Sequence, residues 1–114
     1  MQNIVVAYLF LFVAIVAEIL GTTLLAMSAQ FTRLWPTLGM GAAYLVSFYL
    51  LTRVLETLPL AVAYAFWGGL GIVLTTLVGS IWLKQSLDPP AIIGIALIVA
   101  GVVAINGFSK AVAH

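Results

Sequence analysis

The chain has 114 residues, of which 65% are hydrophobic and 6% are charged, and its formal net charge is +1. Soluble domains carry about 25% charged residues, so the composition excludes an ordinary soluble protein. The sequence has no basic cluster of the kind that binds nucleic acid. It has no cysteine, and its single histidine, His114, is the last residue. These features exclude disulfides and thiolate metal sites, and we expect no metal or cofactor.

The first hydrophobic run covers residues 4–27 and is long enough to cross a bilayer as a helix, which takes about 20 residues. Glu18 lies in its middle. An ionisable group at this depth costs several kcal/mol, so it is a functional hypothesis by default. The alternative is a protonated structural glutamate that hydrogen-bonds to a neighbouring helix. Residues at i, i+3 and i+4 steps share its helical face. Most of them are small enough for close packing or a ligand: Ala7, Leu11, Ala14, Gly21, Thr22 and Leu25.

The second run covers residues 36–55 and starts at Pro36. Tyr44 and Ser47 belong to a mixed face of this span, and Tyr44 is placed to hydrogen-bond Glu18, although packing explains its position equally well. Arg53 lies near the end of the span, where its long side chain can reach water. The link to the next span, ETLP, is so short that the second and third spans should form an antiparallel hairpin.

The third run covers residues 60–83 and opens with AYAFWGGLG. Tyr64, Trp67, Gly68 and Gly71 share one helical face. An aromatic face suits an organic cation through cation–π contact. The alternative is that Trp67 is an interfacial anchor, as membrane tryptophans often are. The glycines permit either a kink or the close approach of another helix.

The fourth run covers residues 89–108, with Asp88 as the expected N-cap and Pro89 at the first helical position. Small residues repeat along it, with Ala96, Ala100 and Ala104 four apart and Gly94 and Gly101 seven apart. Such spacing is typical of helix–helix interfaces in lipid, so this span is expected to mediate dimerisation.

The four runs predict an all-α membrane protein with one domain, residues 1–114. An even number of spans puts Arg53 and Lys110 on one side and Arg33 and Lys84 on the other. Two basic residues on each side give the positive-inside rule no preferred orientation. We therefore expect both orientations, paired as an antiparallel homodimer. Two Glu18 carboxylates near one cavity would favour protonation through burial and repulsion, so that protons and a cation compete for them.

Five motifs, in order along nearly the whole chain, resemble the small multidrug resistance transporter family and its multidrug, quaternary-ammonium branch. They are AEILGTT, FTRLWP, AYAFWGGLGIVL, LDPPAIIG and LIVAGV. The resemblance implies a four-helix protomer in an antiparallel, dual-topology homodimer. It also implies proton-coupled export of lipophilic cations across a bacterial inner membrane.

The resemblance assigns roles by position. It implies Glu18 as the shared proton and substrate carboxylate. It implies further chamber residues at Leu11, Ala14, Gly21, Thr22, Tyr44, Ser47, Tyr64 and Trp67. Gly69 and Gly71 match the kink region, and the dimer face is matched by Gly94, Leu97, Ile98, Gly101 and Val102. The chain departs from relatives at Ala26, where a lysine is frequent, and at Gly68, where serine or alanine is frequent. Leu20 stands where the guanidinium-exporting branch usually has tryptophan, which favours the multidrug branch.

The leading hypothesis is thus a proton/organic-cation antiporter. A guanidinium-type exporter of small cations, a dual-topology ion channel and a non-transport accessory subunit are the alternatives. An enzyme is not expected, because no nucleophile–base pair lies within the spans.

Overall fold

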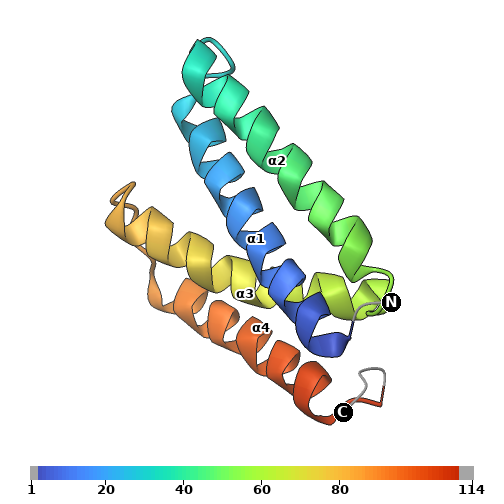
Figure 1. The fold of residues 1–114 in the computed structure, drawn as a ribbon. Helices are drawn as coiled ribbons and strands as arrows, with labels where there is room; N and C mark the ends of the chain where they lie inside the picture. Colours follow the sequence, from blue (N-terminus) through green and yellow to red (C-terminus); the bar gives the residue numbers. More distant parts are fainter. Residues whose placement is uncertain (1–2, 111–114) are drawn as a thin grey trace. The chain divides into compact units, whose positions relative to one another are not determined.

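The computed structural model describes residues 3–110 and contains four helices in this part of the chain, with no strand. They are α1 (Ile4–Met27), α2 (Leu34–Val54), α3 (Leu60–Ile81) and α4 (Pro89–Phe108). Figure 1 shows them in chain order. All four are long and apolar enough to cross a membrane. The predicted all-α fold with four spanning helices is confirmed, while His114 lies outside the described residues.

Two helix ends differ from the sequence prediction. α2 begins at Leu34, two residues before Pro36. Proline is tolerated there because the N–H groups of the first turn have no partner within the helix. α3 ends at Ile81 and not near Leu83. Lys84 adopts a φ of 56°, and the backbone N–H of Gln85 donates to the Gly79 carbonyl at 2.8 Å, which closes the helix.

The chain divides into two compact units, residues 1–57 and 58–114, and each is described by itself. That the whole chain forms one domain stays a prediction. In the first unit α1 and α2 lie side by side as an antiparallel hairpin. Ser28 organises the turn between them: its hydroxyl donates to the Leu25 carbonyl at 2.8 Å and accepts from the Phe31 N–H at 3.1 Å. The turn then takes three left-handed residues, Ala29, Gln30 and Phe31.

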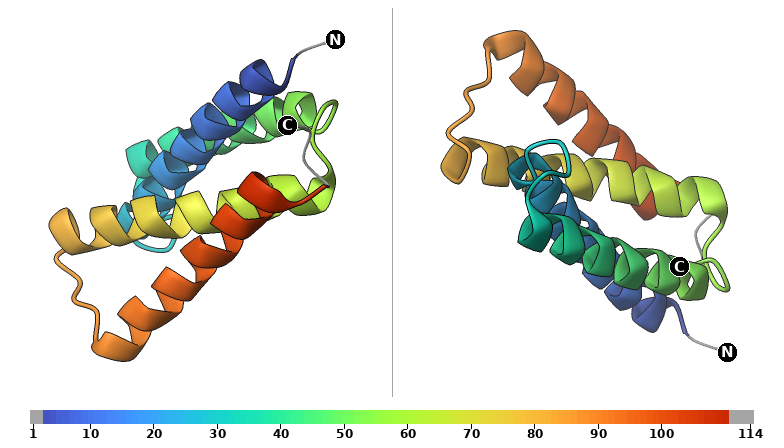
Figure 2. Two further views of the ribbon diagram at one scale, coloured as in Figure 1. Left: turned by 90° about the horizontal axis from the view of Figure 1, so that it is seen from below. Right: turned by 90° about the horizontal axis from the view of Figure 1, so that it is seen from above.

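In the second unit α3 and α4 form another hairpin, and they diverge toward their connecting loop (Figure 2). Gly69 marks a close approach. A Cβ at Gly69 would lie 2.9 Å from the Val102 Cβ and closer still to one of its methyl groups. Glycine is therefore required there by packing, because a methyl group would force the two helices apart.

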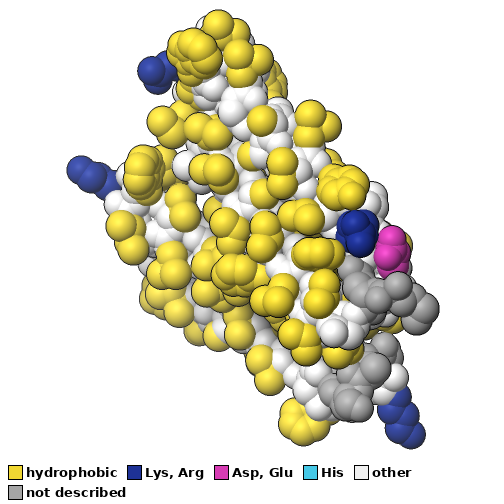
Figure 3. Space-filling model, viewed as in Figure 1, with side chains coloured by type: hydrophobic (Ala, Val, Ile, Leu, Met, Phe, Trp, Pro, Cys, Tyr) yellow, Lys and Arg dark blue, Asp and Glu magenta, His cyan; other side chains and the backbone are white. Residues whose placement is uncertain are grey.

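Hydrophobic side chains cover most of the face visible in Figure 3, and the few charged side chains seen on this face lie toward its edges. None of the residues of α4 is buried, although all but Asn106 are apolar or small. An apolar helix that is covered within its own unit only where it contacts α3 is suited to lipid or to a partner helix.

We predict that Gly69→Ala lowers the free energy of unfolding by about 1–3 kcal/mol, the typical cost of overpacking a close contact. Unfolding by a denaturing detergent, followed by circular dichroism, measures the change. The double variant Gly69→Ala/Val102→Ala should recover part of the loss, because it removes the methyl groups of Val102 but keeps its Cβ, 2.9 Å from the added one.

Gly68→Ala is the matched control, because no atom lies within 4 Å of a Cβ at that position. It should be neutral or slightly stabilising, since alanine favours a helix over glycine by up to about 1 kcal/mol. Equal effects of the two alanine substitutions would contradict the packing role of Gly69.

Candidate functional site

Glu18 lies in the middle of α1 and is half-buried. The hydroxyl of Thr22, one helical turn later, donates to Glu18 Oε2 at 2.9 Å. The same Thr22 oxygen lies 2.9 Å from the hydroxyl of Tyr44 on α2. The structure thus brings three of the predicted site residues together in one hydrogen-bonded chain. Tyr44 reaches Glu18 through Thr22, where the sequence had suggested a direct bond.

Two contacts fix α2 against the Glu18 turn. The Tyr44 ring packs directly on Gly21, since a Cβ at Gly21 would lie 2.7 Å from the Cδ1 and Cε1 atoms of Tyr44. The hydroxyl of Ser47, which is fully buried, donates to the Ala14 carbonyl at 2.7 Å. The N–H of Glu18 is the helical partner of that same carbonyl. Ser47 and Tyr44, three residues apart on one face of α2, therefore hold the turns before and after Glu18.

The face of α1 that carries Glu18 follows the predicted pattern. Ala7, Leu11 and Ala14 are fully buried, and Gly21 is buried beside Tyr44. These side chains carry no charge and leave the carboxylate in an environment of aliphatic groups and hydroxyls. An ionised group in an apolar span is costly unless a partner balances its charge.

The two arginines of the first unit lie near the two ends of α2, with Arg33 just before its first residue and Arg53 in its last turn. The guanidinium of Arg53, near the end of α2, lies over the Phe10 ring at 5.8 Å and 3.6 Å from Glu56. Phe10 precedes Glu18 by eight residues, which is about 12 Å along a helix. The guanidinium of Arg53 thus lies toward the end of the hairpin, away from the Glu18 turn.

Tyr64 and Trp67 form the aromatic face of α3 within the second unit. Their ring centroids lie 6.4 Å apart at an interplanar angle of 45°. Tyr64 is 52% exposed, and a Cβ at Gly71 would meet the indole Cδ1 at 3.7 Å. The two rings therefore make one surface that is open to a ligand or a partner, with the buried Gly71 against the indole ring.

The remaining predicted residues lie on α3 and α4. α3 is one unbroken helix through Gly69 and Gly71, and Gly69 serves the contact with Val102 described above. A Cβ at Gly94 or Gly101 would meet no atom within 4 Å, and Leu97 and Ile98 are exposed. Val102 therefore packs against α3, whereas α3 leaves the other four residues of the predicted dimer face uncovered within the second unit.

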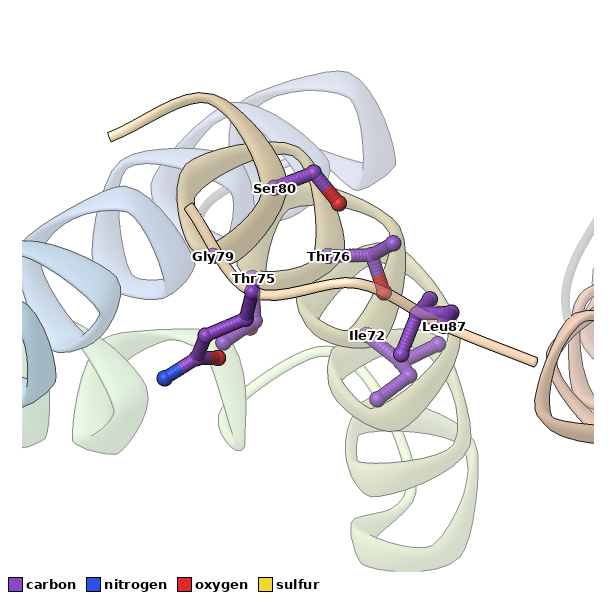
Figure 4. A pocket seen from close by; sticks show the side chains of 7 residues that line it. Ile72, Thr75, Thr76, Gly79, Ser80 and Leu87 are labelled. Carbon is purple, nitrogen blue, oxygen red and sulfur yellow. The ribbon is translucent and has the colours of Figure 1, made fainter. Parts of the chain in front are cut away.

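A pocket of about 180 Å³ lies at the other end of α3, against the loop that leads to α4 (Figure 4). Its lining consists of apolar, hydroxyl and amide side chains together with a glycine: Ile72, Thr75, Thr76, Gly79, Ser80, Gln85 and Leu87. The sequence did not lead us to predict this pocket. The one pattern that indicates it is the i, i+4 spacing of Ile72, Thr76 and Ser80, which puts two hydroxyls on one helical face.

Comparison with known proteins agrees with the predicted resemblance. The family model described as Small Multidrug Resistance protein matches residues 6–98. The chain is 49% identical over 107 residues to the multidrug transporter EmrE of Escherichia coli K12, covering 94% of this chain and 97% of that protein. It is 47% identical over 103 residues to the quaternary ammonium compound-resistance protein QacG of a Staphylococcus species, covering 90% and 96%. QacE of Escherichia coli, of the same description, is 44% identical over 107 residues, covering 94% and 97%.

These matches extend over nearly the whole chain, and the relatives carry multidrug and quaternary-ammonium names. With its four membrane-spanning helices, the chain is a multi-pass protein of the bacterial inner membrane. The protein belongs to the small multidrug resistance family, in its multidrug and quaternary-ammonium branch.

Proposed function

We propose that this protein is a proton-coupled antiporter that exports lipophilic and aromatic cations, such as quaternary ammonium compounds, with Glu18 as the shared site for proton and cation. One observation carries the proposal: Glu18 lies half-buried in the middle of an apolar span and is bonded by the neutral hydroxyl of Thr22. A carboxylate in lipid needs a countercharge, and a proton or an organic cation can each supply it. The two ligands then exclude one another, which is the minimal requirement for exchange.

The Tyr64–Trp67 face is proposed to select the class of cation. Two tilted aromatic rings present π surfaces that attract a cation and also bury its hydrophobic groups. The names of the relatives, which include multidrug transporters and quaternary ammonium compound-resistance proteins, support this class of substrate. They also favour transport over catalysis and the multidrug role over export of guanidinium alone.

The transporting form is proposed to be an antiparallel homodimer with dual topology. Two basic residues lie on each side of the predicted spans, which leaves the orientation balanced. Gly94 and Gly101 leave shallow gaps on α4 that the second unit does not fill, and Leu97 and Ile98 are exposed on the same helix. Small residues of this kind let a second helix approach closely in lipid. Two copies would bring two Glu18 carboxylates to one chamber.

An ion channel and an accessory subunit are the rival functions. A channel would pass current without exchanging protons for cations. An accessory subunit would tolerate the loss of the Glu18 charge. Exchange in purified proteoliposomes therefore separates all three functions, because it tests coupling without any other protein.

We predict that Glu18→Gln reduces uptake of a quaternary ammonium compound, driven by a pH gradient in proteoliposomes, to the level of protein-free vesicles. The amide cannot release a proton or balance a cation's charge. Glu56→Gln is the matched control, because Glu56 lies in the turn after α2 with an exposed side chain. It should transport like the parent protein. Coupled exchange by Glu18→Gln at the parent rate would refute the antiport mechanism.

We predict that Trp67→Ala weakens the binding of tetraphenylphosphonium about five- to thirtyfold, which corresponds to about 1–2 kcal/mol of lost cation–π and packing energy. Binding of a small cation such as guanidinium should change much less. Equilibrium dialysis with both cations measures the difference. Trp82→Ala serves as the control, since Trp82 is 67% exposed just beyond the end of α3. Equal losses for both cations would remove Trp67 from the selective surface.

We predict that Gly101→Val separates the two protomers, because its methyl groups occupy a gap that the second α4 should fill. Pull-down of an untagged copy by a tagged copy in mild detergent measures the association. Val103→Leu, an exposed and volume-increasing change on the same helix, is the control. Undiminished pull-down by Gly101→Val would exclude this face of α4 from the dimer.

A further inference from the structure

Thr22 stands between two groups that compete for its single proton. Its hydroxyl oxygen lies 2.9 Å from Glu18 Oε2 and 2.9 Å from the Tyr44 hydroxyl. A threonine hydroxyl donates one hydrogen bond and accepts others. It can therefore donate to Glu18 or to Tyr44, but not to both at once.

The charge of Glu18 decides the direction of both hydrogen bonds that Thr22 makes. An ionised carboxylate only accepts, so Thr22 donates to Glu18 and Tyr44 donates to Thr22. A proton on Oε2 makes Glu18 the donor. Thr22 then turns its own proton to Tyr44, and the Tyr44 O–H must point elsewhere. Protonation thus reverses the whole chain of hydrogen bonds.

The heavy atoms of this chain are held while its protons turn. The Tyr44 ring is seated on Gly21, where a Cβ would lie only 2.7 Å from it. The buried Ser47 hydroxyl ties α2 to the Ala14 carbonyl at 2.7 Å. Reversal needs only hydroxyl rotation, which is far faster than movement of a helix.

We propose that Thr22 is a positioning residue that transmits the protonation of Glu18 on α1 to the direction of the Tyr44 O–H on α2. Its use in exchange rests on the proposed function. With Glu18 ionised, the lone pairs of Tyr44 are available and favour a cation. With Glu18 protonated, the Tyr44 O–H no longer donates to Thr22, and the positive end of the Tyr44 O–H dipole repels a cation. The relay thereby strengthens the mutual exclusion of proton and cation beyond the effect of the carboxylate alone.

The other titratable groups of α1 and α2 do not replace Tyr44 in this role. Tyr8 precedes Glu18 by ten residues, which is about 15 Å along a helix. Tyr49 is 60% exposed, and the guanidinium of Arg53 lies over Phe10 near Glu56. In the proposed dimer the second Glu18 is the further charge that bears on the titration.

Difference infrared spectroscopy of the full-length protein in lipid, with isotope-labelled tyrosine and without any organic cation, tests the relay. The phenol C–O stretch distinguishes a tyrosine that donates from one that accepts, and Tyr44→Phe identifies the Tyr44 band. We expect this band to shift as Glu18 is titrated in the parent protein and in Thr22→Ser, which keeps the hydroxyl. Thr22→Val, of nearly equal shape, should abolish the shift.

An unchanged Tyr44 band in the parent protein, or a full shift in Thr22→Val, would overturn the proposal. The parent measurement decides even if Thr22→Val does not fold. Glu18→Gln should hold the band at one position at every pH. Failure of the antiport proposal is separate, because it would appear as absent pH-driven exchange while the Tyr44 band still responds to titration.

Discussion

The hydrogen bond from Thr22 to Glu18 is the interaction on which the candidate site depends. A carboxylate that exchanges a proton for a cation in an apolar span, as proposed for Glu18, needs surroundings that can accept both of its charge states. A fixed cation would lock the ionised form, and purely aliphatic neighbours would lock the neutral form. A hydroxyl does neither, because it can donate to a carboxylate and accept from a carboxylic acid. The 2.9 Å contact is therefore suited to a group that changes state.

Glycine is used for close packing in both hairpins, and each time a specific side chain occupies the space of its missing Cβ. Tyr44 lies against Gly21 between α1 and α2, and Val102 lies against Gly69 between α3 and α4. In lipid the hydrophobic effect gives helices no reason to associate, so van der Waals contact at such points has to hold them. The first of these contacts also orients a functional side chain, because it fixes the ring whose hydroxyl reaches Thr22.

The sequence was sufficient to predict the four spans and the residues around Glu18, because hydrophobic run length and helical spacing are local properties. It did not decide outcomes that depend on contacts between helices. A bond from Tyr44 to Glu18 and simple packing were equally open, and the hydroxyl that Tyr44 meets depends on how closely its ring approaches Gly21. Nothing in the sequence indicated that Val102, which the resemblance matched to the dimer face, fills the space at Gly69. The sequence predicted the end of α3 near Leu83, whereas the helix ends at Ile81. The left-handed conformation of Lys84 closes it, and no local sequence pattern predicts that conformation.

The uncovered surface of α4 does not by itself require a partner, because apolar side chains are as well solvated by lipid tails as by another helix. The shape of α4 supports the proposed second copy. Gly94 and Gly101 lie seven residues apart and so on one face, and each leaves a gap that the second unit does not fill. A flexible lipid tail loses conformational entropy when it fills such a gap. The ridge of a second helix is already ordered and loses little. Because Val102 already packs against Gly69, the second helix of the proposed dimer would meet α4 along Gly94, Leu97, Ile98 and Gly101.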